Sequence, residues 1–118
     1  MFKQTQPDIV SICVPDGQHF LILKKIIKYK PKLVICEKPI TTKIVDTEKI
    51  IKLYKKNKIS VLVNYSRRFD VVIQQLKKDL SENKYGRVVS ASGIYSKGIL
   101  HNGSHLIDLA SFLFGKIK

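Results

Sequence analysis

Lys38 is the residue of this 118-residue chain whose surroundings most favour chemistry. It stands between Glu37 and Pro39, directly after the apolar run 33–36. Such a run is typical of a buried strand, and the proline prevents that strand from continuing as a paired ladder. A lysine at the end of a buried strand can bind a substrate hydroxyl through a charge-assisted hydrogen bond. The tripeptide is therefore our first candidate for a catalytic site.

Two further strand-like runs also lead into polar residues. The run 8–15 precedes His19, and the run 59–64 ends in Asn64. In an open parallel sheet, ligands bind beyond the carboxyl ends of the strands. We therefore expect these polar residues to meet Lys38 at one edge of a sheet.

The elements that would position these residues alternate between strand and helix. Strand-like runs at 8–15, 33–36 and 59–64 are separated by two segments with apolar residues at helical spacing and lysines on the other side. This alternation predicts right-handed crossovers and a parallel sheet covered by helices. The nearly continuous apolar character of the first run predicts strands that are buried on both faces.

The pattern changes after the paired arginines at 67 and 68. The predicted elements are, in order, a helix over 71–83, a single strand over 87–95, a glycine-containing loop over 97–103 and an apolar helix over 104–114. Val72, Leu76 and Leu80 are predicted to face inward from the first of these helices. A lone strand cannot pair its own edges, so we expect more sheet than the chain supplies and a truncated C-terminus.

Four segments in this order resemble the Gfo/Idh/MocA family of NAD(P)-dependent oxidoreductases, named for glucose-fructose oxidoreductase and inositol dehydrogenase. They are Val-Pro-x-x-x-His at 14–19, Glu-Lys-Pro at 37–39, Asn-Tyr-Ser-Arg-Arg-Phe at 64–69, and the stretch 98–109, which ends in His-x-x-Asp-Leu. One Glu-Lys-Pro would be a weak signal, whereas four ordered matches that cover residues 8–115 are a strong one.

The resemblance implies hydride transfer between a nicotinamide cofactor, NAD or NADP, and the hydroxyl of a sugar, sugar nucleotide or polyol. It implies that Lys38 binds the reacting hydroxyl and that His105 accepts or donates its proton, a role that suits imidazole. The residues implied in cofactor binding are Val14, Pro15, His19, Glu37 and Lys38. Those implied in substrate binding are His101, Asn64 and Tyr65.

His101 departs from the family pattern, because many members have an aspartate four residues before the catalytic histidine. A histidine can hydrogen-bond a hydroxyl but lacks the negative charge of a carboxylate, which implies a different substrate. The residue types leave three alternatives open: His19 as a helix-start histidine, His105 as a structural histidine at a helix N-terminus, and Lys38 as a solvent-exposed lysine at a strand end. Asp108 is expected to be structural, and Arg68 to brace the domain junction.

The net charge of +13 comes mainly from lysines on helix-like stretches, and only three arginines are present. Arginine is preferred for bidentate recognition of bases and phosphates, so we expect no specific nucleic-acid partner. Salt-sensitive polyanion binding by the lysine face is a lesser alternative. Cys13 and Cys36 lie in apolar runs and are expected to be buried hydrophobes, and we predict no metal site.

No apolar run approaches the ~20 residues of a membrane span, and the first residues lack the apolar core of a signal peptide. We therefore expect a cytoplasmic protein with no membrane partner. A dinucleotide fold carries a G-x-G-x-x-G loop after its first strand, and that pattern is absent from the sequence. This absence predicts truncation at the start as well.

The fold prediction is an α/β chain in two parts. Residues 1–66 are predicted to be the second half of a dinucleotide-binding Rossmann domain without its glycine-rich loop. Residues 67–118 are predicted to begin an α+β substrate-binding and oligomerisation domain, so a homo-oligomer is expected. We predict that the chain is a fragment of an NAD(P)-dependent oxidoreductase that acts on a small sugar or polyol. The alternative is a non-catalytic module of the same fold that no longer binds dinucleotide.

Overall fold

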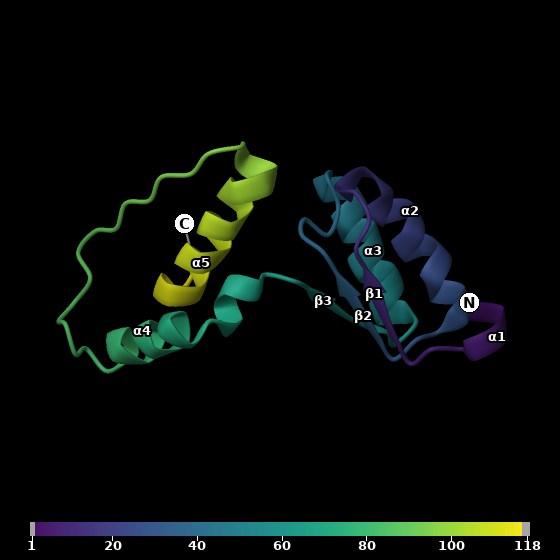
Figure 1. Ribbon diagram of the computed structural model, residues 1–118, viewed down its shortest axis with the longest axis horizontal. Coiled ribbons are helices and arrows are strands. Elements are labelled where there is room, and N and C mark those ends of the chain that lie inside the picture. The colour runs from purple at the N-terminus through teal and green to yellow at the C-terminus, as the bar shows by residue number, and fades with distance from the viewer. Residues whose placement is uncertain (1, 117–118) are drawn as a thin grey trace. The chain divides into compact units, whose positions relative to one another are not determined.

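The computed structural model describes residues 2–116 and divides into two compact units, Met1–Asn64 and Tyr65–Lys118 (Figure 1). The division falls two residues before the boundary expected from sequence. Whether the units are a cofactor-binding half and the start of a substrate domain stays a prediction.

A three-stranded parallel sheet forms the centre of the first unit. After the short helix α1 (Phe2–Thr5), the strands are β1 (Ile9–Ile12), β2 (Leu33–Cys36) and β3 (Ser60–Val63), in the order β1-β2-β3. The predicted α/β class with a Rossmann-type parallel sheet is confirmed. β2 has the bounds of its apolar run, whereas β1 and β3 are shorter than theirs, because the outer residues of those two runs continue into connections.

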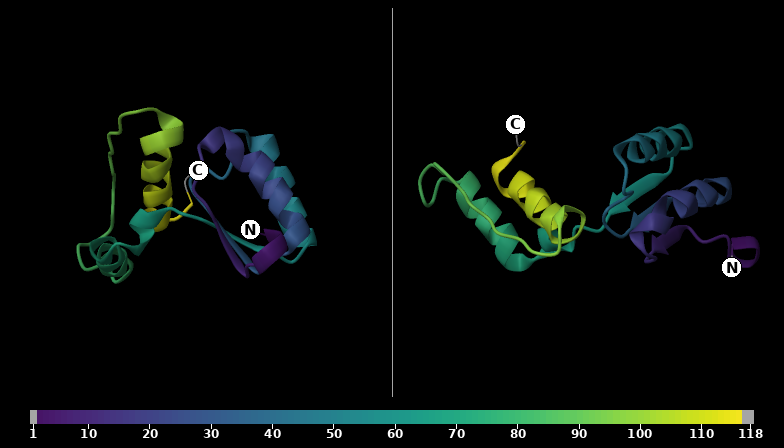
Figure 2. Two further views of the ribbon diagram at one scale, coloured as in Figure 1. Left: turned by 45° about the vertical axis from the view of Figure 1, so that its right-hand side comes forward. Right: turned by 90° about the horizontal axis from the view of Figure 1, so that it is seen from above.

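Both crossover helices lie on the same face of this sheet (Figure 1, Figure 2). They are α2 (Asp16–Ile26), which a 3-10 turn extends to Tyr29, and α3 (Ile44–Lys56). Right-handed connections that step in one direction along a sheet must place their helices on one side. Residues on β1 accordingly alternate between exposed and buried, and Ile9 is 59% exposed. The expectation of strands buried on both faces was wrong for the part of the chain that the structure describes.

The core lies between the covered face of the sheet and the two helices. Leu23 of α2 and Ile50 and Tyr54 of α3 are buried against Val34 and other sheet residues. The Tyr54 hydroxyl donates to the Leu23 carbonyl at 3.1 Å, so the polar end of a large buried ring is satisfied and the two helices are joined.

The two cysteines differ in their surroundings. Cys36 is buried in the core, and its pKa rises to about 11, chiefly because burial disfavours the thiolate and secondarily because Glu37 is nearby. Cys13 is exposed, with its Sγ 3.3 Å from the Ser11 hydroxyl. The prediction of a buried hydrophobe is therefore confirmed for Cys36 and wrong for Cys13, which lies beyond the end of β1.

Among its described residues, 65–116, the second unit contains two α-helices and two shorter helical turns. A 3-10 turn (Ser66–Phe69) precedes α4 (Val71–Ser81), and a π-helical turn (Ile99–Gly103) leads into α5 (Ser104–Phe114). Asp70 caps α4 by accepting from the backbone N–H groups of Val72 and Ile73 at 2.9 and 3.3 Å. Gly115, at φ +88°, ends α5 in a conformation that favours glycine.

Two predictions for the second unit were wrong. The predicted strand at 87–95 does not form, because the described residues of the second unit contain no strand with which this segment could pair. Val72 is 74% exposed rather than inward-facing.

The buried residue of α4 is Asp79, which accepts hydrogen bonds from Gln75, Lys84 and Tyr85. The hydrogen bond from Lys84, followed by those from Gln75 and Tyr85, holds the pKa of the Asp79 carboxyl below its usual range.

Ile50 and Ile51 form a matched pair for testing the core of the first unit, because they are 0% and 40% exposed on the same helix. We predict that Ile50→Ala lowers the free energy of unfolding by about 2–5 kcal/mol, since it leaves a cavity. Ile51→Ala should cost less than about 1 kcal/mol. Urea denaturation monitored by circular dichroism measures both. Equal losses would contradict the one-sided core.

Candidate active site

The carboxyl ends of the three strands are aligned at one edge of the sheet. Ile12 pairs with Cys36, and Cys36 pairs with Val63. Backbone hydrogen bonds continue one residue further, from the Glu37 N–H to the Ile12 carbonyl at 3.0 Å and from the Asn64 N–H to the Cys36 carbonyl at 2.8 Å. The residues that follow the strands are therefore brought to one edge, as expected from the alternation of elements.

A side-chain hydrogen bond joins the ends of β2 and β3. The Asn64 amide Nδ2 donates to Glu37 Oε1 at 2.7 Å, and both side chains are half-buried. The carboxylate is thereby held in one orientation at the edge where Lys38 follows. The sequence placed both residues at strand ends but carried no signal for this bond, which joins positions 27 residues apart.

Lys38 is half-buried, and the peptide bond between it and Pro39 is cis. Its backbone lies at the end of the central strand, so a neighbouring strand end is present on each side. Of the predicted cofactor residues at the end of β1, Val14 is half-buried and Pro15 is exposed. Both are within the first unit, together with Glu37 and Lys38.

His19 is 1% exposed and contacts the backbone of two loops. Its Nδ1 lies 2.7 Å from the Pro39 carbonyl oxygen, and its Nε2 lies 2.9 Å from the Val14 carbonyl oxygen. Sequence reasoning predicted a ring that lines the cofactor. In the structure, both ring nitrogens are directed at backbone carbonyls within the protein.

Two of the remaining predicted site residues contact each other in the second unit. The rings of Tyr65 and His105 meet edge to face, with centroids 5.8 Å apart. His105 lies in the first turn of α5, and its Nδ1 atom is buried. Burial raises the pKa of the Tyr65 phenol, and the Asp108 carboxylate raises it further, while a hydrogen bond with Ser104 and the charge of Arg68 act in the opposite direction.

The contact between Tyr65 and His105 is supported by an ion pair one helical turn further along α5. Arg68 donates to Asp108 twice, from Nε to Oδ2 at 2.8 Å and from Nη2 to Oδ1 at 2.6 Å. This bidentate geometry is the strong form of a guanidinium–carboxylate contact. It joins the 3-10 turn that follows Tyr65 to the helix that carries His105. The contact agrees with the structural role expected for Asp108, which stays a prediction.

His101 is exposed and lies in the π-helical turn before α5. The Ser104 hydroxyl donates to its carbonyl at 2.8 Å, which fixes the backbone between the turn and the helix. His101, His105 and Tyr65 thus belong to the second unit, whereas Lys38 and Asn64 belong to the first. The predicted pairing of Lys38 with His105 stays a prediction.

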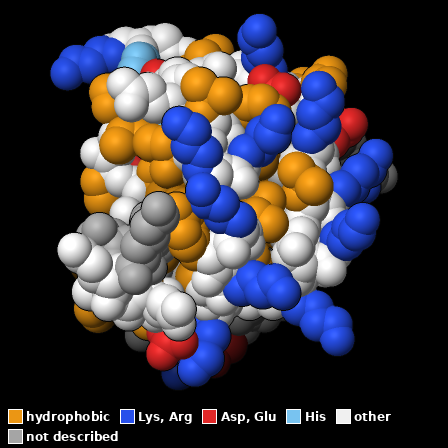
Figure 3. Space-filling model, turned by 90° about the vertical axis from the view of Figure 1, so that its right-hand side faces the viewer, with side chains coloured by type: hydrophobic (Ala, Val, Ile, Leu, Met, Phe, Trp, Pro, Cys, Tyr) orange, Lys and Arg blue, Asp and Glu red, His pale blue; other side chains and the backbone are white. Residues whose placement is uncertain are grey.

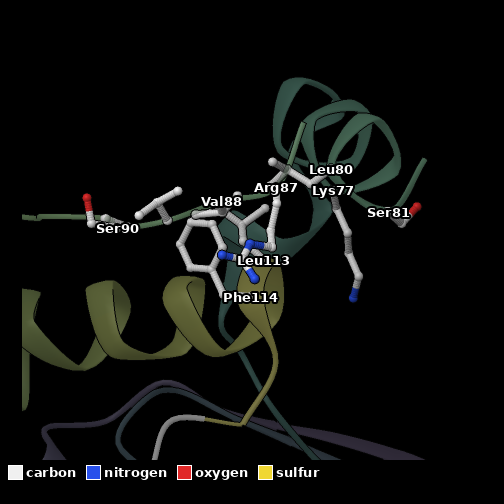
Figure 4. A pocket seen from close by; sticks show the side chains of 10 residues that line it. Lys77, Leu80, Ser81, Arg87, Val88, Ser90, Leu113 and Phe114 are labelled. Atoms are coloured by element: carbon white, nitrogen blue, oxygen red, sulfur yellow. The ribbon is translucent and has the colours of Figure 1, made fainter. Parts of the chain in front are cut away.

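A groove in the second unit contains none of the predicted site residues. It has a volume of about 530 Å³ and lies between the extended segment at 87–91 and the facing sides of α4 and α5 (Figure 4). Lys77 and Leu80 line it from α4, and Leu113 and Phe114 from α5. Its walls are chiefly aliphatic and aromatic, and it offers no paired acid and base.

Basic side chains are frequent on one face of the first unit. Figure 3 shows them dispersed among hydrophobic side chains on the side where α1 and α2 lie in Figure 1. Among residues 2–116, no group of three or more histidine, cysteine, aspartate or glutamate side chains could hold a metal ion. Within the same residues, no helix is long and apolar enough to cross a membrane.

The raised pKa of Tyr65 yields a test of the geometry around α5. We predict that Asp108→Asn lowers the Tyr65 pKa, because the carboxylate that disfavours tyrosinate is removed and the Arg68 charge is left unneutralised. Titration of tyrosinate absorbance, with Tyr65→Phe to identify the transition, measures the change. Asp70→Asn is the control, since asparagine also caps a helix. An unchanged Tyr65 titration in Asp108→Asn would contradict the arrangement.

The chain is similar in sequence and fold to several known oxidoreductases. The inositol 2-dehydrogenase of Rhizobium meliloti is 27% identical over 130 residues, which cover 92% of this chain and 37% of that protein. The myo-inositol 2-dehydrogenase of Thermotoga maritima is 29% identical over 87 residues, covering 74% of this chain and 26% of that protein. A solved oxidoreductase from Pseudomonas syringae superposes with a TM-score of 0.80 at 25% identity, covering 97% of this chain and 35% of that one.

The chain thus spans about a third of the length of the curated relatives that it matches. The family model described as "Oxidoreductase family, NAD-binding Rossmann fold" matches residues 1–65, more than half of the chain. That match contains all three parallel strands and the polar residues at their carboxyl ends. The chain belongs to the Gfo/Idh/MocA family of NAD-binding Rossmann-fold oxidoreductases.

Proposed function

We propose that this chain supplies the catalytic edge of an NAD(P)-dependent oxidoreductase that transfers hydride between the cofactor and the hydroxyl of a sugar, sugar nucleotide or polyol. The observation that carries the proposal is the alignment of three parallel strand ends, with Lys38 after the central one. Open parallel sheets bind ligands at this edge.

The residues at this edge are suited to a nicotinamide cofactor. Val14 and Pro15 provide apolar surface after β1, while Glu37 and Asn64 provide an oriented carboxylate and amide after the neighbouring strands. Lys38 is only half-buried, so a ligand at the edge can reach it. These residues would hold the nicotinamide and its ribose, and the proposal covers both NAD and NADP.

Each proposed catalytic residue has one task. Lys38 binds the oxygen of the reacting hydroxyl by a charge-assisted hydrogen bond and orients the carbon that carries the hydride. His105 accepts the hydroxyl proton during oxidation and returns it during reduction. The cofactor, when bound, supplies the hydride acceptor at C4 of the nicotinamide. In oxidation of the alcohol, Lys38 would hold the hydroxyl oxygen and His105 would take its proton, while a bound cofactor would take up the hydride.

The names of two relatives and two residues of the second unit support the proposed substrate class. Two relatives at 27% and 29% identity are named as dehydrogenases of inositol, a polyol. Tyr65 and His101 offer a phenol and an imidazole to substrate hydroxyl groups, with no carboxylate at position 101. We propose a sugar, sugar nucleotide or polyol as substrate, and a homo-oligomeric cytoplasmic enzyme.

Replacing Lys38 tests the catalytic assignment. In the complete enzyme that the proposal implies, Lys38→Ala should lower kcat at least about 100-fold, because the reacting hydroxyl loses its charged partner and its orientation. The assay follows the absorbance of the reduced cofactor with a panel of polyols and sugars. Lys52→Ala, on the exposed side of α3, is the matched control and should retain full turnover. Near-normal turnover of Lys38→Ala would remove Lys38 from the mechanism.

Cofactor titration of the 118-residue chain tests the importance of the phosphate loop. We predict no micromolar binding of NADH or NADPH, because the sequence contains no G-x-G-x-x-G segment to hold the pyrophosphate. Isothermal titration calorimetry is the measurement. Micromolar binding of either cofactor would show that the strand ends suffice without that loop.

A further inference from the structure

His19 is a fully buried polar side chain whose contacts reach two segments of the candidate active site. It lies in the first turns of α2, and its ring approaches the carbonyl of Val14 on one side and the carbonyl of Pro39 on the other. Val14 belongs to the connection between β1 and α2. Pro39 directly follows Lys38, so the ring touches the backbone next to the proposed catalytic residue.

The chemistry of these contacts requires the ring to be the donor. A carbonyl oxygen only accepts hydrogen bonds, so each contact needs a hydrogen on the imidazole nitrogen that faces it, and both contacts form together only when both nitrogens carry a hydrogen, as in the imidazolium form. The distances of 2.7 Å from Nδ1 and 2.9 Å from Nε2 are those of N–H···O bonds. A buried ring in this position can therefore hold two loops at a fixed separation through its two nitrogens.

We propose that His19 is a positioning residue for Lys38, and this inference rests on the catalytic role proposed for that lysine. The Nδ1–H bond to the Pro39 carbonyl fixes the backbone after Lys38, and the Nε2–H bond to the Val14 carbonyl ties that backbone to the end of β1. The bond between Asn64 and Glu37 ties the end of β2 to that of β3. The two sets of bonds together join all three strand ends.

Two amide substitutions separate the two contacts. In His19→Asn, the side-chain nitrogen can occupy the position of Nδ1 and restore only the bond to Pro39. In His19→Gln, it can occupy the position of Nε2 and restore only the bond to Val14. His19→Leu removes both donors while keeping an apolar volume in the core. Gln18→Ala, at the exposed neighbouring position, is the matched control.

The readouts are the carbonyl carbon chemical shifts of Val14 and Pro39 and amide hydrogen exchange, measured on the 118-residue chain without cofactor. The Glu37 amide, bonded to Ile12, reports on the end that carries Lys38, and the Gln18 amide, bonded to Pro15, reports on the other loop. We expect about tenfold faster exchange where a bond is lost.

The expected pattern is crossed. His19→Asn should preserve the Pro39 shift and Glu37 exchange while disturbing the Val14 side, and His19→Gln should do the reverse. His19→Leu should disturb both sides, and Gln18→Ala neither. If the asparagine and glutamine variants behave alike, or if both fail to fold, then ring volume rather than the two donors matters and the proposal is overturned.

The chemical shifts and exchange rates of the His19 variants are measured without turnover, so they test the hydrogen bonds separately from the catalytic role of Lys38. A crossed pattern combined with normal turnover of Lys38→Ala would establish the two hydrogen bonds of His19 and remove the catalytic role of Lys38. Loss of turnover in Lys38→Ala without the crossed pattern would keep the proposed function and exclude His19 as the residue that positions Lys38.

Discussion

The parallel register of β1, β2 and β3 is the constraint on which the candidate site depends. Because Ile12, Cys36 and Val63 lie in line across the sheet, the backbone that leaves each strand does so at the same edge. Polar residues that are far apart in the chain therefore lie next to one another, although the sequence around each of them does not indicate which residues its neighbours will be. The side-chain bonds at this edge can form only because the register has already placed their backbones together.

In the second unit, an ion pair rather than strand pairing brings candidate site residues together. It lacks a described sheet, so the position of its helices relative to the segment that enters them rests on side chains. The bidentate pair of Arg68 and Asp108 joins that segment to α5, and the ring of Tyr65 then packs against His105. One geometrically specific ion pair thus takes over the ordering role that backbone pairing has in the first unit.

Most of the first unit was predictable from sequence, because short apolar runs and helical spacing report directly on local structure. The range of β2 and that of α5 were predicted correctly to the residue. The face of the sheet left open was not predictable from apolar character alone, since a run such as that around Ile9 looks the same whether one face or both are covered. The segment at 87–95 has the composition of a strand, but pairing requires a partner that its own residues cannot supply.

The candidate site shows the same limit. Residue type and position found Lys38, Glu37 and Asn64, because strand ends are visible in the sequence. The two contacts of His19 were not predictable, because they are made to backbone carbonyls, and every residue has a carbonyl. The fold decides which of them a buried imidazole will meet, so a histidine predicted at a cofactor site is seen to bind the protein itself.

The uncovered face of the sheet has a consequence for the behaviour of the chain in solution. Ile9 and Leu62 are exposed there, in a protein that carries a net charge of +13. Apolar surface draws copies together, while like charges keep them apart over a distance that shrinks to about 10 Å at 0.1 M salt. Salt weakens the repulsion and leaves the apolar attraction in place. Colloidal stability of this chain is therefore set by ionic strength, and dilute buffers favour dispersed molecules.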